Sequence, residues 1–189
     1  NPKLPEPLIW EGIVLSSEAG AAGGLGALSL AKEARQRLDE ALKIDERALG
    51  GSAYASLATL YAKVPGWPVG FGDKERAEEY YRKAADLRPQ LAGPRTGLGM
   101  LQLRLGNEVE GRKLLDAAFK ADPFNVRVSN SRKVLDHLDK YTTVETAHYI
   151  LKFDAKTDQL LADWLADYLE ETHAELKRQF GFEPPGKVL

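Results

Sequence analysis

Three histidines are the first candidates for chemistry in this chain, because imidazole serves both as a general base and as a common metal ligand. They are His137, His148 and His173, and no two of them stand one helical turn apart. A zinc-peptidase helix needs such a pair, as in the motif HExxH, which does not occur here. Convergence in space stays open, but the sequence provides no preformed pair. We therefore expect no stoichiometric zinc and no peptide cleavage from the chain as given.

The nearest approach to a metal motif is Glu170-x-x-His173, which places a carboxylate and an imidazole on one face of a helix. Di-iron bundles use two such pairs together with two further glutamates. A second pair is absent from this sequence. We therefore interpret Glu170 and His173 as part of a solvated helix surface.

Other catalytic motifs are missing as well. The glycine-rich run from Gly20 to Gly26 lacks the preceding strand and the terminal Lys-Ser or Lys-Thr of a phosphate loop, so we interpret it as a helix connector, flexible or closely packed. The absence of cysteine excludes disulfides, thiolate metal sites and thiol catalysis. We predict no catalytic residue, no metal ligand and no cofactor-binding residue.

Charge and hydropathy argue against two classes of partner. The 189 residues include 26 basic and 28 acidic side chains, and a net charge of −2 does not attract nucleic acid. The uncharged run from Ala19 to Ala31 is shorter than the roughly 20 residues that cross a bilayer. The sequence starts at Asn1 without methionine or a basic-then-apolar leader, and we interpret it as a processed protein or an excised fragment.

An internal repeat leads to the fold prediction. Two helices that end at prolines, Lys74–Pro89 and Asn107–Pro123, superpose at a step of 34 residues, which places Tyr81 on Leu115. The helix from Ala31 to Asp45 has the same rhythm. These three helices are expected to be equivalent members of a repeating unit.

Each of these helices follows another that has a small residue at its middle. The small residues are found in Leu98-Gly99, in Leu57-Ala58 and, more loosely, in Trp10-Glu11-Gly12. Two antiparallel helices approach closely only where one offers glycine or alanine to a large residue on the other. We therefore predict antiparallel hairpins that stack through apolar residues at three- and four-residue steps.

This pattern resembles the tetratricopeptide repeat (TPR), a 34-residue helix–turn–helix unit with small residues at the helix crossing. The unit from Pro94 to Pro123 matches it at Leu98, Gly99, Gly106, Ala118 and Pro123. The unit before it matches at Tyr54, Leu57, Ala58, Tyr61, Ala77, Tyr81, Ala84 and Pro89, with about seven extra residues between its helices. The first unit, roughly Leu8 to Asp45, departs further through the insertion AGAAGGLGALS.

The TPR resemblance implies a concave groove that binds a peptide and is lined by the first helix of each pair. Its outward positions are Ala55, Thr59, Ala62 and Lys63 in the second unit and Thr96, Met100, Leu103 and Arg104 in the third. The Lys, Arg and Asn clamp of the TPR subfamily that binds chaperone tails is absent. The groove is expected to be shallow and largely apolar, which suits an amphipathic helix or the chain's own C-terminal segment.

The insertion from Val64 to Asp73, VPGWPVGFGD, carries two aromatic residues among turn-forming prolines and glycines. Either Trp67 and Phe71 fold back over the end of the hairpin, or they form a small contact site for a partner. Asp73 suits the N-cap of the following helix. The stretch GSAYASLATLYAKVPGWPVGFGD resembles a loop of small exported bacterial TPR proteins, which implies a helper of the periplasm or cell envelope.

The hydrophobic period changes after Pro123. A helix from about Asn125 to Leu138 is expected to cap the repeats, and the alternation in TAHYILKFD predicts a strand from Thr146 to Asp154. A long helix from about Thr157 to Phe180 follows, with Gly181 at its C-cap. Its apolar stripe comprises Leu160, Leu161, Trp164, Leu165, Tyr168, Leu169, Leu176 and Phe180.

The run from Tyr141 to Leu189 resembles the start of the peptidase-MA-like, gluzincin-type metallopeptidase domains that follow TPR units in bacterial proteins. The matching features are the strand HYILKFD, the helix LADWLADYLEETHAELKRQFGFEPP and the opening of a second strand, KVL. The zinc helix of that family lies downstream of these elements, so the resemblance covers no catalytic residue. We interpret residues from about 143 onward as the entrance to a further domain.

The expected architecture is mostly α: a TPR-type α-solenoid of antiparallel hairpins over residues 1–140, followed by a short α+β segment over residues 141–189. The expected function is a non-enzymatic protein–protein interaction scaffold, whose partner is a protein, a peptide or its own C-terminal domain. The alternative is the N-terminal TPR part of a zinc metallopeptidase whose HExxH region lies outside this chain. The sequence leaves the partner, the oligomeric state and the compartment open.

Overall fold

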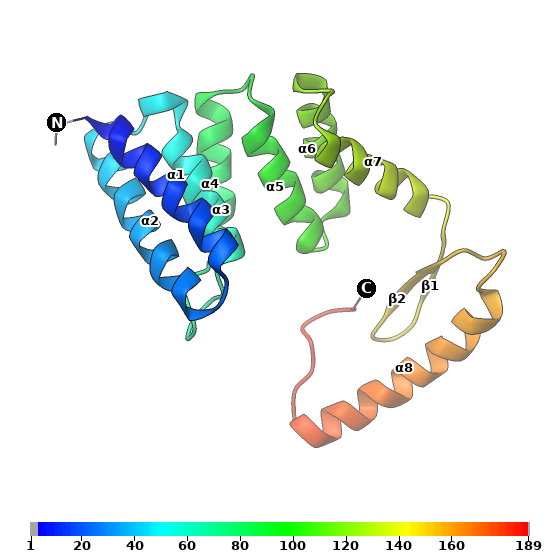
Figure 1. The fold of residues 1–189 in the computed structure, drawn as a ribbon. Coiled ribbons are helices and arrows are strands. Elements are labelled where there is room, and N and C mark those ends of the chain that lie inside the picture. The colour runs from blue at the N-terminus through cyan, green and yellow to red at the C-terminus, as the bar shows by residue number, and fades with distance from the viewer. Residues whose placement is uncertain (1–3, 189) are drawn as a thin grey trace. The chain divides into compact units, whose positions relative to one another are not determined.

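The computed structural model describes residues 4–188, except for the side chain of Leu25, and most of these residues are helical. Figure 1 shows the helices and strands along the chain. The chain divides into two compact units, Asn1–Ser129 and Asn130–Leu189. Among the described residues, no helix combines the length and the apolar character that crossing a bilayer requires.

The N-terminal unit is built from helices that pack as neighbours in sequence, and Figure 1 shows them side by side. The pairs are α1 (Pro5–Ala22) with α2 (Gly24–Ile44), α3 (Ser52–Lys63) with α4 (Lys74–Leu87), and α5 (Ala92–Arg104) with α6 (Glu108–Ala121). A short 3-10 helix, η1 (Ala48–Gly50), precedes α3. Contacts of α2 with α3 and of α4 with α5 join the pairs into one unit.

The second helix of each pair buries a triplet of residues in a common order, with a large side chain between two small ones. The triplets are Ala34, Leu38 and Ala41 in α2, Ala77, Tyr81 and Ala84 in α4, and Gly111, Leu115 and Ala118 in α6. The triplets of α4 and α6 stand 34 residues apart, as the sequence predicts. Packed helix pairs with this shared pattern of burial are compatible with a helical repeat.

In the first and third pairs, a glycine of the first helix receives the large central residue of the triplet. A β-carbon added at Gly12 would lie 2.6 Å from Cγ of Leu38, and one at Gly99 would lie 3.0 Å from Cγ of Leu115. Ala58, the corresponding residue of α3, is fully buried. The predicted close approach at a small residue is therefore confirmed for the first and third pairs.

The insertion AGAAGGLGALS is helical along most of its length. Helix α1 continues to Ala22 and α2 begins at Gly24, so only Gly23 separates them. Gly23 has φ of +64°, a conformation that glycine adopts without a steric penalty. The insertion therefore lengthens the two helices of the first pair, and the connector between them is a single residue.

The C-terminal unit contains most of α7 (Val126–Leu138), a two-stranded antiparallel sheet and a long helix. The strands β1 (Thr142–Glu145) and β2 (Ile150–Phe153) pair with Thr142 opposite Phe153, and α8 (Gln159–Phe180) packs on β2. The observed α7 and α8 confirm the two predicted helices. Gly181 ends α8 in the left-handed region with φ of +63°, as its C-cap position predicts.

The strands differ from the prediction in length and number. Only residues 150–153 of the expected strand form β2, because residues 146–149 make the connection from β1. Strand β1 itself was not predicted from the sequence. Val188 forms a single parallel bridge with Tyr149, and Leu189 lies outside the described residues. Much of the predicted apolar stripe of α8 is exposed within the described structure. The buried residues of α8 are Ala162 and His173, which lie outside that stripe.

Candidate functional site

A groove of about 660 Å³ lies on the N-terminal unit and is lined mainly by the first helix of each pair. Side chains of α1, α3 and α5 form most of it. Tyr81 of α4 and Arg127 at the start of α7 complete its wall. The first helices of the three pairs thus supply most of the lining, and α1 adds side chains to the positions named for α3 and α5.

Most of the positions expected to face a partner line this groove. They are Ala55, Thr59, Ala62 and Lys63 in α3 and Thr96, Met100 and Arg104 in α5. Leu103 is the exception, because its side chain packs on α6, where a β-carbon at Gly111 would lie 2.7 Å from Cδ2 of Leu103. Because an α-helix turns by about 100° per residue, Leu103 and its neighbour Arg104 point in different directions. Leu103 therefore faces the second helix of its own pair and does not line this groove.

The polar groups in the centre of the groove already have partners. The Thr59 hydroxyl donates to the carbonyl oxygen of Ala55 at 2.9 Å and lies 3.0 Å from the Tyr81 hydroxyl. The Thr96 hydroxyl donates to the carbonyl oxygen of Ala92 at 2.9 Å. Burial raises the pKa of Tyr81 above its usual value, and the hydrogen bond with Thr59 opposes this rise. The centre of the groove thus offers methyl groups and a neutral phenol.

The charged side chains that line the groove all carry the same sign. They are Lys63 of α3, Arg104 of α5 and Arg127 of α7, and no Asp or Glu lines the groove. Within the described residues, none of the three forms an ion pair. The groove therefore combines an apolar centre with uncompensated positive charge, and this combination favours a negatively charged ligand.

A second cavity of about 460 Å³ adjoins the groove and shares Thr59 and Lys63 with it. Its wall includes Ala19, Gly20 and Ala27 from the glycine- and alanine-rich ends of α1 and α2. These residues have little or no side chain, so the two helices leave open space beside α3. The insertion thus shapes an apolar extension of the groove.

The two aromatic residues of the insertion before α4 have different environments. Phe71 packs edge-on against Tyr61 with ring centroids 5.5 Å apart, and the Arg35 guanidinium lies 4.4 Å from the Phe71 ring centre. Trp67 is 90% exposed. Folding back over the hairpin end is therefore observed for Phe71, and Trp67 remains the residue that is free to contact a partner.

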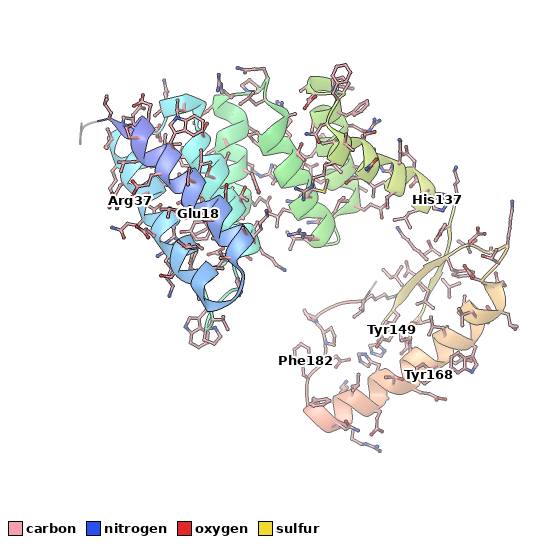
Figure 2. All side chains as sticks on the ribbon, in the orientation of Figure 1. Glu18, Arg37, His137, Tyr149, Tyr168 and Phe182 are labelled. Carbon is pink, nitrogen blue, oxygen red and sulfur yellow. The ribbon has the colours of Figure 1, made fainter. Side chains whose placement is uncertain are left out.

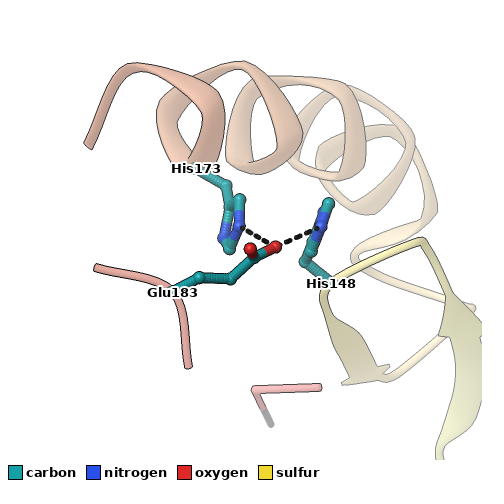
Figure 3. Close-up of side chains that lie close together, drawn as sticks. All are labelled: His148, His173 and Glu183. Atoms are coloured by element: carbon teal, nitrogen blue, oxygen red, sulfur yellow. Dashed lines mark ion pairs between the residues drawn. The ribbon is translucent and has the colours of Figure 1, made fainter. Parts of the chain in front are cut away.

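A separate cluster in the C-terminal unit brings two of the three histidines together. His148 precedes β2 and His173 lies on α8, and their rings stack with centroids 3.8 Å apart and an interplanar angle of 15°. Oε1 of Glu183 lies 3.4 Å from Nε2 of His148 and 3.6 Å from Nε2 of His173 (Figure 3). Tyr149, labelled in Figure 2, meets the His173 ring edge-on at 6.0 Å.

Glu170 belongs to the same cluster through His148. Its Oε2 lies 2.6 Å from Nδ1 of His148, while its Oε1 accepts hydrogen bonds from the backbone N–H of His148 at 2.8 Å and from the Thr146 hydroxyl at 2.5 Å. The hydrogen bond with His148 and then that with Thr146 lower the pKa of Glu170 to about 2. The interpretation of Glu170 and His173 as a solvated surface was wrong, since Glu170 is engaged and His173 is only 7% exposed.

His137 does not join this cluster, because it packs edge-on against Tyr141 with centroids 5.3 Å apart. Sequence spacing could not reveal that His148, His173 and Glu183 converge, since each comes from a different element. The nearest signal in the sequence was Glu170-x-x-His173, which marks the correct helix but pairs the wrong residues.

No protein-family model and no curated protein matches the chain. The functional argument therefore depends on the groove and the histidine cluster themselves.

Proposed function

We propose that the N-terminal unit is a TPR-type α-solenoid and acts as a non-enzymatic scaffold that binds an acidic segment of a partner protein. The observation that carries this proposal is the groove, which is lined by the first helices of three pairs and whose charged residues are all basic. The 34-residue step from α4 to α6 and the small residues at the helix crossings support the TPR assignment.

The composition of the groove defines the chemistry of the partner. Ile13 and Met100 offer apolar contacts near the centre, whereas Lys63, Arg104 and Arg127 supply positive charge. A segment that combines leucine-like side chains with aspartate or glutamate would satisfy both features. Such a segment would bury its apolar side chains against α3 and α5 and place its carboxylates near the three cations. The affinity should fall as salt is added, because these charges are accessible to solvent.

The experiment compares two fluorescein-labelled peptides of equal length. One alternates leucine with glutamate, and the other replaces each glutamate with lysine. Fluorescence anisotropy with the full chain should show saturable binding of the acidic peptide and none of the basic one. The double variant Lys63→Glu, Arg104→Glu should weaken binding of the acidic peptide at least tenfold, because it replaces two positive charges of the groove with negative ones. A factor of ten corresponds to about 1.4 kcal/mol.

Lys120→Glu is the matched control, since Lys120 is an exposed residue of α6 that does not line the groove. This variant should bind the acidic peptide as the unchanged protein does. Equal binding of the two peptides, or equal weakening by Lys120→Glu and by the double variant, would contradict the proposed binding mode.

A further inference from the structure

We propose that His148, His173 and Glu183 form a binding site for one divalent transition-metal ion, with Zn²⁺ as the best-suited ion. These residues belong entirely to the C-terminal unit, so the proposal is independent of the groove. Among the described residues, each of the three offers a ligand atom, and these atoms lie within 4.8 Å of one another. Two imidazoles and one carboxylate are a ligand set that zinc commonly accepts.

The distances from the Glu183 carboxylate to the two imidazoles fit an ion better than they fit direct hydrogen bonds. A tetrahedral zinc ion with bonds of about 2.0–2.1 Å holds its ligand atoms about 3.4 Å apart. Oε1 of Glu183 lies 3.4 Å from Nε2 of His148 and 3.6 Å from Nε2 of His173. Hydrogen bonds between nitrogen and oxygen are normally about 2.7–3.2 Å long. The carboxylate oxygen therefore stands at the spacing that a shared cation requires.

The backbone holds the three residues from separate directions. The carbonyl oxygen of His148 accepts a hydrogen bond from the N–H of Val188 at 2.8 Å, and its own N–H is bound by Glu170. His173 is fixed within α8, and the left-handed turn at Gly181 leads the chain back toward Glu183. Lys177 binds Oε2 of Glu183 at 2.6 Å, which leaves Oε1 as the oxygen that faces both imidazoles.

Glu170 supplies the outer support that histidine ligands of metals usually have. The short contact of its Oε2 with Nδ1 of His148 assigns the proton of the neutral imidazole to Nδ1. Nε2 of His148 then carries the lone pair, and it is this nitrogen that faces Glu183. A carboxylate behind the ring also makes the ring a stronger electron donor.

The burial of His173 adds to these distances. Its side chain is only 8% exposed, and its Nε2 is buried without a hydrogen-bond partner within the described structure. A buried polar atom without a partner is destabilising, and in folded proteins it requires a specific explanation. Nε2 of His173 points toward Oε1 of Glu183, as Figure 3 shows, and a metal ion between them would satisfy it.

Metal binding would require a change in the relative orientation of the two histidine rings. The lone pair of an imidazole lies in the plane of its ring, and the two ring planes are only 15° apart. The rings must tilt toward each other for both nitrogens to reach one ion. Three protein ligands would leave a fourth position for water, and the exposed side chains of His148 and Glu183 leave this position open to solvent.

The test uses the full chain without an affinity tag, stripped with EDTA and desalted. Zinc is titrated in the presence of a chromophoric chelator of known affinity, and we expect one ion per chain with sub-micromolar affinity. Cobalt should give the intense visible absorption of a tetrahedral site. His148→Ala and Glu183→Gln should each weaken zinc binding at least tenfold.

His137→Ala is the matched control, because it removes a histidine outside the cluster and should leave zinc affinity unchanged. Glu183 is exposed, so Glu183→Gln keeps the test decisive even if circular dichroism shows that His148→Ala disturbs the fold. No saturable zinc binding by the unchanged chain would overturn the proposal. The same holds if Glu183→Gln binds zinc as tightly as the unchanged chain, which would identify the cluster as a hydrogen-bonded ion-pair network alone.

Discussion

Leu115 of α6 packs directly on Gly99 of α5, so that a β-carbon at Gly99 would lie 3.0 Å from Leu115 Cγ and 3.1 Å from Leu115 Cδ2. The carbonyl oxygen of Gly111 would lie 3.2 Å from the same position. A side chain at this position would therefore meet the backbone of α6 as well as Leu115. This contact determines how closely the two helices of the third pair approach.

Gly99→Leu should therefore overpack the third pair and lower the free energy of unfolding by roughly 1–3 kcal/mol. Urea unfolding followed by circular dichroism measures the loss. Gly93 is the matched control, since it lies on the same helix and a β-carbon there would meet no atom within 4 Å. Gly93→Leu should leave the stability unchanged or raise it slightly, because glycine is a poor helix former. Equal stability of both variants would argue against the assigned helix register.

The two aromatic residues of the insertion should respond differently to truncation. Phe71→Ala removes a half-buried ring that packs on Tyr61, and it should cost about 2 kcal/mol, near half the loss for a fully buried phenylalanine. Trp67→Ala should change the stability by less than about 0.5 kcal/mol, because Trp67 is 90% exposed. Chemical unfolding of the two variants side by side checks the contrast. A large loss with Trp67→Ala would show that the indole is buried in solution.

Asp73 caps α4, since its Oδ1 accepts a hydrogen bond from the backbone N–H of Arg76 at 3.0 Å. Asp73→Ala should lower the free energy of unfolding by about 1 kcal/mol, whereas Asp73→Asn should retain most of the stability because asparagine also caps helices. Asp86→Ala, at an exposed position near the other end of α4, serves as control and should cost nothing. Thermal melting of the three variants separates the cap from a general effect of lost charge.

Tyr81 should make the stability of the N-terminal unit sensitive to alkaline pH. Burial raises the pKa of Tyr81 in the folded protein above its ordinary value near 10. Above pH 10 the unfolded chain loses this proton while the folded chain keeps it, so the unfolded state is favoured as pH rises. The stability contributed by the protonated phenol is complete below pH 10 and declines above it. Urea unfolding at pH 9 and pH 11 should show a smaller loss for Tyr81→Phe than for the unchanged protein.

Glu170, whose carboxylate contacts Nδ1 of the proposed zinc ligand His148, gives a further prediction. Glu170→Ala should weaken zinc binding by about 10–100-fold, the usual effect of removing a carboxylate behind a histidine ligand. Glu171→Ala changes the exposed neighbouring residue of α8 and should leave the affinity unchanged. Competition with the same chromophoric chelator measures both variants. An unchanged affinity in Glu170→Ala would show that Glu170 does not position His148 for a metal.

Local periodicity was enough to predict much of the helical part. The 34-residue step placed Tyr81 and Leu115 at equivalent buried positions, and Gly99 at the crossing of its pair, because helix packing repeats with the spacing of side chains along one face. Gly181 could be assigned to a helix end for a similarly local reason, since the left-handed conformation favours glycine. Local patterns failed for β1, which is short and mostly polar.

Tertiary structure decided the features that depend on distant parts of the chain. The convergence of His148, His173 and Glu183 depends on a strand connection, a helix and a returning segment, and no sequence interval encodes that meeting. The opposite environments of Phe71 and Trp67 also follow from packing, because Phe71 packs on the ring of Tyr61 in α3 while Trp67 is 90% exposed. Residue spacing specifies neighbours along one element, whereas contacts between elements depend on how those elements are placed in space.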